Sequence, residues 1–320
     1  MILAGDIGGT NTRLGLFEAG TGRPRPMQMA TYSTAGFPGL EEMVERFIAD
    51  HGLDRSAISS AAFGVAGPVR NDRVELTNAS WQIDARRFSS RAGIARVRLA
   101  NDLTSMAYAV PVLEDRELAP LQAGFPDPTG NAALIAPGTG LGESLLHNVA
   151  GTFIPSPSEA GHADFAPRTP REIALLQDLT TRLGRASYED VISGPGLVSI
   201  HRFTHPTPCV EVDTTAADAA ANISASAMDG RCQACVEALD IFVSVLGAEA
   251  GNLALRSMAT SGLYVGGGIA PRILAALRGP QFLAGFLDKA PMRDLMASIP
   301  VHVILHPDPG LLGAAVLASR

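Results

Sequence analysis

Short apolar runs alternate with glycine-rich turns and longer amphipathic stretches along this chain. Residues 2–5 and 12–18 are β-type runs separated by Gly-Gly-Thr-Asn, a pattern that predicts a hairpin. The same kind of pattern predicts three further strands and two helices, at 27–33, 59–65 and 96–100 and at about 38–50 and 102–110. The first third of the chain is therefore expected to form a mixed α/β layer.

A segment rich in proline, glycine and charge, residues 114–131, follows that layer, and we expect a domain boundary near residue 111. Beyond it, residues 132–137 and 141–147 again have the character of two strands, separated by the turn Gly138-Thr139-Gly140. IGGTNTRLGLF near the start of the chain and APGTGLGESLL after the boundary share one plan. The recurrence suggests that the two halves arose by duplication.

The rest of the second half is predicted to be mainly helical. Helices are expected at about 170–183, 213–227, 230–256, 270–278 and 281–297, with one strand at 262–266. A last strand at 300–305 and a helix at 309–318 are expected to return to the first domain.

Length and charge narrow the possible classes of protein. A chain of 320 residues suits two domains of roughly 150 residues each. The 25 basic and 32 acidic residues leave a net charge of -7, and no basic run is interleaved with aromatics, which disfavours nucleic-acid binding. ATP remains compatible with this charge, because backbone N–H groups, a helix N-terminus and Mg²⁺ can hold phosphates with few basic side chains.

The hydropathy pattern predicts neither a membrane span nor a secretion signal. Uninterrupted apolar runs such as the eight residues Leu311 to Ala318 are well short of the roughly 20 that a span requires. MILAGDIGG at the N-terminus looks like a first strand and not a signal peptide. We therefore expect a cytoplasmic protein without membrane contact, whose three cysteines, Cys209, Cys232 and Cys235, are reduced thiols.

The first hairpin turn has the composition of a phosphate-binding loop. Asp6 ends a strand, Gly8 and Gly9 allow close approach of the backbone to a ligand, and Thr10 and Asn11 add hydroxyl and amide groups. The motif is neither a Walker P-loop nor the G-x-G-x-x-G of a dinucleotide fold. The alternative is a glycine-rich hairpin that only reverses the chain.

Two further glycine motifs are ambiguous by themselves. In PGTGLG, the N–H groups of Gly138 and Thr139 and the Thr139 hydroxyl are candidates for phosphate binding, but a structural turn explains the motif about as well. Gly266, Gly267 and Gly268 follow the strand LYV; they offer either bare backbone for an adenosine or close packing of helix on strand.

Seven motifs together resemble those of the bacterial glucokinases, members of the actin/Hsp70/sugar-kinase superfamily. They are GDIGGTNTR, LTNASW, LANDLTSMA, PGTGLG, EAGH, SYEDVISGPGL and LYVGGGIAPRI, in that order, and they span nearly the whole chain. The resemblance implies an α/β fold of two actin-like (ribonuclease H-like) domains, each a mixed sheet flanked by helices, with a ligand cleft between them. It implies a small domain of residues 1–110 plus 301–320 and a large domain of residues 111–300.

The resemblance also implies the chemistry. Asp102 would accept the proton of the 6-hydroxyl of glucose as that oxygen attacks the γ-phosphoryl group; the alternative, from its place before a predicted helix, is an N-cap. The residues implied for glucose are Asn78, Asn101, Asp102, Glu159, His162 and Glu189. Those implied for ATP are Asp6, Gly8, Gly9, Thr10, Asn11, Gly138, Thr139, Gly266, Gly267 and Gly268.

Some of these residues also have a separate interpretation. Glu159 and His162 are three apart, which places both on one face of a helical turn. Glu189 taken alone has the character of a solvated surface charge. Asp6 is the carboxylate expected nearest to Mg²⁺, which ATP and water would otherwise hold.

A zinc site is not expected from these patterns. Cys232-x-x-Cys235 lies in a helical pattern without a second pair at zinc-finger spacing, which favours free thiols. The spacing of His201 with His205, and of His302 with His306, is attributed to chance. EAGHADFAPRTPRE contains no cysteine, so the chain resembles the zinc-free glucokinases and not the related repressor/kinase branch.

The expected function is thus ATP-dependent phosphorylation of glucose in glycolysis, by a homodimer that uses Mg²⁺. A kinase for mannose, fructose or an amino sugar stays open, since short loops set the choice of sugar, and so does polyphosphate or ADP as donor. A sugar-sensing regulator is a remote alternative, because the first hairpin begins by residue 5 and leaves no room for an N-terminal helix-turn-helix.

Overall fold

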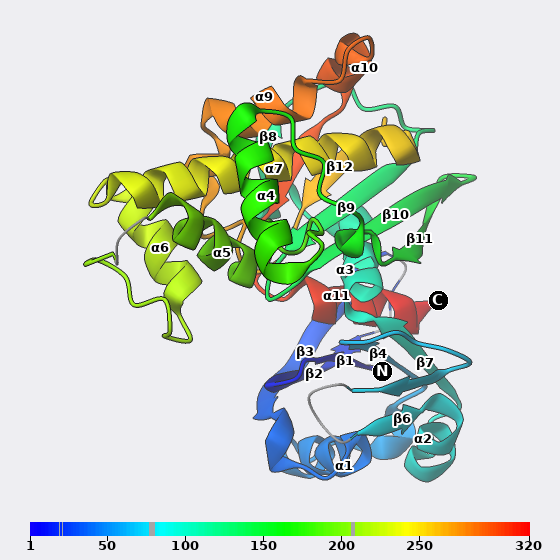
Figure 1. The fold of residues 1–320 in the computed structure, drawn as a ribbon. Helices are drawn as coiled ribbons and strands as arrows, with labels where there is room; N and C mark the ends of the chain where they lie inside the picture. Colours follow the sequence, from blue (N-terminus) through cyan, green and yellow to red (C-terminus); the bar gives the residue numbers. More distant parts are fainter. Residues whose placement is uncertain (19, 21, 77–80, 206–208) are drawn as a thin grey trace. The chain divides into compact units, whose positions relative to one another are not determined.

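The structure, a computed structural model, describes residues 1–18, 20, 22–76, 81–205 and 209–320. Its contacts divide the chain into two compact units. Unit 1 contains Met1–Glu114 and His306–Arg320, and unit 2 contains Asp115–Leu305. Each unit is built on its own β-sheet covered by helices, as Figure 1 shows.

The sheet of unit 1 has the strand order β3-β2-β1-β4-β7. Its strands are β1 (Ile2–Ile7), β2 (Asn11–Glu18), β3 (Arg25–Ser33), β4 (Ser60–Val65) and β7 (Arg96–Asn101). A short hairpin of β5 (Arg73–Glu75) and β6 (Gln82–Asp84) lies outside it. β1 is antiparallel to β2 and parallel to β4, and β4 is parallel to β7, so the predicted hairpin is confirmed.

Alternation along β1 gives unit 1 two cores. Leu3 and Ile7 face a cluster that includes Phe47 of α1 and Phe88 of α2, whereas Ile2 and Ala4 face α11. The helices of unit 1 are α1 (Leu40–Asp50), α2 (Ala85–Ala92), α3 (Asp102–Ala109) and α11 (Pro309–Ser319). Figure 1 shows α11, in red, beside α3, and both pack on the face that Ile2 and Ala4 line.

The sheet of unit 2 has the order β11-β10-β9-β12-β13-β8. Its strands are β8 (Leu118–Gln122), β9 (Ala132–Pro137), β10 (Leu141–Val149), β11 (Thr152–Ser158), β12 (Gly262–Val265) and β13 (Val301–Ile304). Its helices are α4 (Pro170–Leu183), α5 (Gly194–Thr204), α6 (Ala219–Met228), α7 (Gln233–Ser257), α8 (Leu274–Leu277), α9 (Pro280–Leu287) and α10 (Arg293–Ser298). One apolar cluster joins α7 to the sheet and to the helices around it.

The two sheets repeat one topology, as the two matching motifs suggested. In each, a hairpin (β1-β2 or β9-β10) is extended on one side by a third antiparallel strand, β3 or β11. On the other side each first strand is followed by parallel strands, β4 and β7 in unit 1 and β12 and β13 in unit 2. The two glycine-rich turns therefore occupy equivalent positions in their sheets.

Several sequence expectations need correction. The strand at 300–305 does not return to the first sheet: β13 pairs with β12 and β8 in unit 2, and only α11 belongs to unit 1. The connecting segment 114–131 contributes an edge strand, β8. The helix expected over 281–297 is two helices, α9 and α10, with a cis Ala290-Pro291 bond between them.

The expectation that no segment approaches a membrane span is also wrong when only length and composition are considered. Helix α7 is long and apolar enough to cross a bilayer when judged on length and composition alone. However, 78% of its most apolar stretch is buried inside the fold, where residues such as Phe242 and Leu246 pack in the core of unit 2. Its apolar length is accounted for by this burial.

Candidate active site

The first hairpin turn is held in shape by its own backbone and by Thr34. The Gly8 N–H donates to the Asn11 carbonyl (3.0 Å), and the Thr34 hydroxyl donates to the Gly8 carbonyl (2.8 Å). The Thr34 N–H donates to the Thr10 carbonyl (2.9 Å). Because the Gly8 N–H is used inside the turn, the phosphate donors predicted here narrow to Gly9, Thr10 and Asn11; Thr10 and Asn11 are exposed.

Three carboxylates gather beside this turn: Asp6, Asp102 and Asp308, which we call the carboxylate corner. Asp6 is the second-last residue of β1, with 24% of its side chain exposed, and Arg13 contacts it at 3.8 Å while also contacting Asp308 at 2.8 Å. Burial raises the pKa of Asp6 to about 6, and repulsion from Asp102 and, more weakly, Asp308 adds to this, whereas Arg13 acts in the opposite direction. A cation placed here would relieve that repulsion.

Asp102 is the first residue of α3 and directly follows β7. The N-cap of α3 is its neighbour Asn101, whose side-chain oxygen accepts from the N–H groups of Leu103 (3.0 Å) and Thr104 (3.3 Å). The interpretation of Asp102 as an N-cap is therefore wrong. Since β1, β4 and β7 are parallel neighbours, Asp6 and Asp102 lie at the same carboxyl edge of the sheet, where ligands of open α/β sheets bind.

In unit 2, Glu189 is anchored and is not a freely solvated charge. Its Oε2 accepts from the Leu141 N–H (2.8 Å), and its Oε1 lies 3.9 Å from His162 Nδ1. Gly140 makes this possible, because a Cβ at that position would lie 2.5 Å from Glu189 Oε2. One carboxylate oxygen is thus fixed on the backbone, while the side chain keeps 34% of its surface exposed.

Glu159 and His162 lie on one short turn, as their spacing predicted. Glu159 precedes the 3₁₀ helix η5 (Ala160–His162), and its carbonyl accepts from the His162 N–H at 3.1 Å. Both side chains are exposed. The structure thus brings His162 to Glu189 and places Glu159 on the same turn; the remaining predicted sugar residue, Asn78, lies outside the described residues.

Unit 2 also contains a cavity of about 590 Å³, a size that suits a nucleotide or other small organic ligand. Gly138, Thr139 and Gly268, three of the residues predicted for ATP, line it. Its other lining residues include Gly194 and Pro195 at the start of α5, Thr214, residues 216–221 and Arg272. We call it the unit 2 cavity.

The sequence reasoning missed most of this lining. Gly194 and Pro195 belong to SYEDVISGPGL, a motif that pointed to the sugar through Glu189 but was not connected with the nucleotide. Thr214 and Asp218 follow no recognisable motif. Arg272 stands four residues after Gly268 and brings a positive charge to the cavity. The interpretation of this motif rested on its three glycines and therefore missed the arginine.

The prediction that the Gly138 N–H binds phosphate is wrong. The Gly138 N–H donates to the Gly140 carbonyl (2.8 Å) within the turn. It is therefore not the phosphate donor that the sequence predicted. The Gly138 carbonyl accepts from the Gly194 N–H, also at 2.8 Å, which joins the turn to the start of α5. Gly138 therefore shapes the cavity wall, and Thr139 remains the phosphate-binding candidate of this turn.

The three glycines after β12 divide the two roles that the sequence left open. Gly266 donates to the Ile135 carbonyl at 2.8 Å. Gly267 has φ 78° and packs so closely on β9 that a Cβ would lie 2.3 Å from the Pro137 carbonyl oxygen. Gly268 has nothing within 4 Å of a Cβ position and lines the cavity. Gly267 thus serves packing, and Gly268 provides open space.

Comparison with known proteins agrees with this arrangement. The sequence model of the family described as Glucokinase matches residues 3–320. A curated glucokinase of Nostoc sp. is 38% identical, over 100% of this chain and 99% of its own length. A glucokinase structure from an Antarctic psychrotroph aligns with a TM-score of 0.89 and 31% identity, over 99% of this chain and 98% of that one. A Streptomyces griseus ROK family glucokinase, solved with glucose and AMPPNP, shares the fold at 22% identity and a TM-score of 0.65, over 99% and 98%.

Proposed function

The chain belongs to the glucokinase family and is an ATP-dependent glucose kinase, and we propose that Asp102 is the general base of this reaction. In the proposed step, the 6-hydroxyl oxygen of glucose forms a bond to the γ-phosphorus of ATP while its proton passes to the Asp102 carboxylate. The bond between the γ-phosphorus and the bridging oxygen of ADP breaks, and ADP leaves with that electron pair.

The observation that carries this proposal is the position of Asp102. It stands at the carboxyl edge of the sheet, and Asn101 caps the helix in its place. Phosphoryl transfer has a loose transition state in which alignment and charge neutralisation matter more than the strength of the base. The Leu103 N–H donates to Asp102 Oδ1 at 2.8 Å, and this contact orients the carboxylate, which is what this reaction needs.

Mg²⁺ fits the same corner. The Asp6 carboxylate offers hard oxygen donors, and its repulsion with Asp102 and Asp308 would fall if a cation were nearby. We propose that Asp6 holds Mg²⁺ through water, while ATP supplies the other ligands. The ion would neutralise the charge that develops on the phosphates, and Gly9, Thr10 and Asn11 would position them.

For the sugar, we propose that Glu189, His162 and Glu159 bind hydroxyls, together with Asn101 and Asn78. Glu189 supports this best, because its Oε2 is fixed on Leu141 and its Oε1 is turned toward His162. A rigid acceptor distinguishes epimers, since a misplaced hydroxyl leaves a polar group unpaired. The solved relative with bound glucose and AMPPNP supports these two ligands.

We propose the unit 2 cavity as the adenosine site. Its volume of about 590 Å³ is within the range of small-molecule pockets, and Gly268 leaves room for a flat ring against bare backbone. Arg272 and Asp218, two exposed residues of its lining, would supply one positive and one negative group for the ribose and phosphates. Thr139, at the second hairpin turn, would meet the phosphates.

Initial rates with ATP and Mg²⁺ on a panel of glucose, mannose, fructose and glucosamine test the substrate directly. We expect kcat/KM to be highest for glucose, and a higher value for another hexose would reassign the sugar. Replacing ATP by ADP or by polyphosphate in the same assay should reduce the rate strongly. An equal rate with polyphosphate would contradict the adenosine site, and an equal rate with ADP would reassign the phosphoryl donor.

Three further properties are proposals that rest on the family. We propose that the protein acts in the cytoplasm, in the first step of glycolysis, and as a homodimer. The mass in solution, measured by light scattering after gel filtration, tests the dimer. A mass of one chain at micromolar concentration would contradict it.

A further inference from the structure

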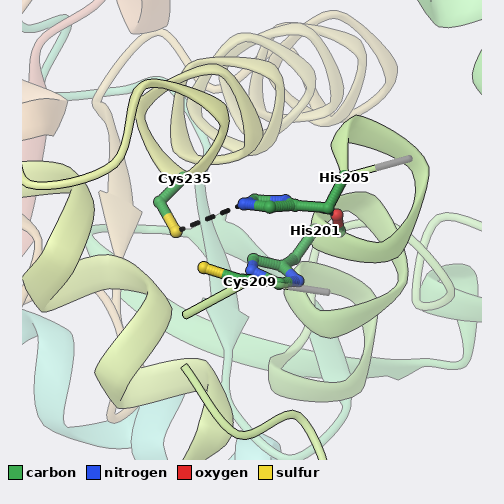
Figure 2. Close-up of side chains that lie close together, drawn as sticks. All are labelled: His201, His205, Cys209 and Cys235. Atoms are coloured by element: carbon green, nitrogen blue, oxygen red, sulfur yellow. Dashed lines mark hydrogen bonds between the residues drawn. The ribbon is translucent and has the colours of Figure 1, made fainter. Parts of the chain in front are cut away.

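Two histidines and two cysteines of unit 2 converge in a place unconnected with the residues proposed for glucose. His201 and His205 are one turn apart at the end of α5, Cys235 is in the first turn of α7, and Cys209 follows α5 in the chain. One nitrogen or sulfur atom of each lies within 4.8 Å of the others. Figure 2 shows the two imidazole rings stacked, with the two sulfur atoms beside them.

The buried side chain of His201 is the first indication of a ligand-binding site here. Its side chain is only 2% exposed, and neither ring nitrogen has a hydrogen-bond partner among the described residues. Buried polar groups are nearly always paired, and an unpaired one costs roughly 1–3 kcal/mol. Packing alone would not favour an imidazole with both nitrogens unsatisfied, whereas a metal ion would satisfy one of them directly.

His205 is oriented as a metal-binding histidine would be. Its Nδ1 lies 2.8 Å from the His201 carbonyl oxygen, so it carries the proton and donates to that oxygen. The other nitrogen, Nε2, is then an acceptor, and it lies 3.9 Å from the Cys235 sulfur. A backbone carbonyl that fixes the tautomer in this way is the usual arrangement around a metal-bound imidazole.

We propose that His201, His205, Cys209 and Cys235 bind one Zn²⁺ ion. Bonds of about 2.0–2.3 Å in tetrahedral geometry place neighbouring ligand atoms roughly 3.3–3.8 Å apart. The separation of 3.9 Å between His205 and Cys235 is close to this, and the largest, 4.8 Å, closes by side-chain rotation. Two thiolates neutralise the charge of the ion, which suits a buried site, and mixed nitrogen and sulfur ligands favour zinc over Mg²⁺ or Ca²⁺.

Cys232 is a neighbour of this site. It is the N-cap of α7, and its sulfur lies 3.3 Å from His205 Nε2 and 4.0 Å from the Cys209 sulfur. The competing chemistry is a Cys209–Cys232 disulfide, but 4.0 Å is far beyond the S–S bond length of about 2.05 Å. The assignment of Cys235 and not Cys232 as the fourth ligand can be tested by substitution.

Such an ion would have a structural role, because four protein ligands leave no position open for a substrate. It would join the end of α5 to the start of α7, where the Thr204 hydroxyl already donates to the Ala234 carbonyl at 3.0 Å. The start of α5 lines the unit 2 cavity through Gly194, and Thr214 lines it soon after Cys209. We expect the ion to steady this wall, a consequence that rests on the proposed adenosine site.

Metal content tests the site without any reference to activity. The untagged full chain, produced with zinc in the medium, should contain one zinc per chain by plasma mass spectrometry. Cys209→Ser and Cys235→Ser should lose it. His302→Asn is the matched control, because His302 is another partly buried histidine of unit 2 whose Nδ1 has no partner among the described residues. Zinc absent from the parent chain, or lost equally in the control, would overturn the proposal.

Cobalt substitution identifies the ligands. The chain loaded with Co²⁺ should show the intense visible bands of a tetrahedral ion and a near-ultraviolet thiolate band, and Cys209→Ser should lose both. We expect this variant to fold, because Cys209 is only partly buried. Loss of metal from Cys232→Ser with retention by Cys235→Ser would overturn the assignment of Cys235. A Cys209–Cys232 disulfide found by peptide mass spectrometry would overturn the whole site.

Kinetics separate this proposal from the proposed function. Removal of the zinc should raise KM for ATP several-fold and leave KM for glucose nearly unchanged. Bound zinc whose removal leaves both constants unchanged would support the site and contradict its link to the cavity wall. An inactive chain that still binds one zinc would contradict the proposed function alone.

Discussion

The two hairpin turns of this protein share a backbone plan but have different surroundings. Both join antiparallel strands at the centre of a sheet, and in both the first glycine donates within the turn, Gly8 to Asn11 and Gly138 to Gly140. Around the first turn stand three carboxylates and Arg13. Around the second lie Gly194 and Gly268 and a cavity. The repeated scaffold supplies equivalent positions, and the side chains at the strand ends decide whether a position does chemistry or holds a ligand.

The largest expected effect concerns the first turn. Asp102→Ala should lower kcat by about 10²–10⁴-fold, the usual contribution of a general base, with KM for glucose changed little. A coupled assay of ADP release, with the binding of glucose followed by calorimetry, measures both. Asp178→Ala, which removes an exposed carboxylate paired with Arg182 on α4, is the control and should keep full activity. A kcat within threefold of the parent would remove Asp102 from the role.

The next effect concerns the sugar site near the second turn. Glu189→Gln keeps an oxygen for the Leu141 N–H but loses the negative charge that a sugar hydroxyl would bond. A hydrogen bond to a charged group contributes about 1.5–3 kcal/mol, so KM for glucose should rise by roughly 10–150-fold. Glu237→Gln, on an exposed ion pair with Arg171, is the control. Equal KM values in the two variants would mean that Glu189 only supports the backbone.

A smaller effect separates packing from open space beside the second turn. Gly267→Ala should lower the free energy of unfolding by at least about 1–2 kcal/mol, because a left-handed conformation disfavours a Cβ and this one would also clash with Pro137. Gly268→Ala, one residue later, has space for its Cβ and is the matched control. Urea unfolding curves compare them. Similar midpoints for both variants would show that the close contact at Pro137 is easily relaxed.

The last expected effect is a pH dependence of stability. Glu143 on β10 is fully buried, and burial together with repulsion from Glu249 raises its pKa to about 8, whereas Arg256 lowers it. The folded state then binds a proton that the unfolded state releases near pH 4.5, so this group's contribution to stability is complete below that value and is lost as the pH rises toward 8.

Glu143→Gln should therefore flatten the decline in melting temperature between pH 5 and pH 9, and make the variant the more stable form at the alkaline end. Scanning calorimetry across this range checks the sign. A variant whose melting temperature falls as steeply as that of the parent would show that Glu143 stays ionised in the fold. The result also sharpens the comparison, because the carboxyl group of Glu143 in the second hairpin would then be neutral and buried, unlike the carboxylates beside the first turn.

Much of the fold could be predicted because its signals are local. The strands β1, β2, β4, β7 and β9 are short β-type runs, and their predicted positions agree with the structure to within about two residues. Fewer elements could be predicted where a segment lacks such a local signal. β11 contains two prolines and little alternation, and α5 begins with Gly194-Pro195-Gly196, so neither was predicted.

The residues of the candidate site also differ in whether the sequence alone predicts them. Asp6, Asp102 and Glu189 stand in motifs that sequence alone distinguishes, whereas Thr214 and Asp218 reach the unit 2 cavity only through the way a long segment folds back. The histidine and cysteine cluster shows the limit most clearly. His201-x3-His205 and Cys232-x-x-Cys235 were each dismissed separately, because nothing in the sequence says that α5 packs against the start of α7.

The most direct test of the account is a crystal structure of the chain with glucose, Mg²⁺ and AMPPNP. The account predicts the glucose 6-hydroxyl within hydrogen-bond distance of an Asp102 oxygen, the triphosphate along Thr10 and Thr139, and the adenine in the cavity beside Gly268. An adenine bound elsewhere, or a 6-hydroxyl that contacts a group other than Asp102, would contradict it.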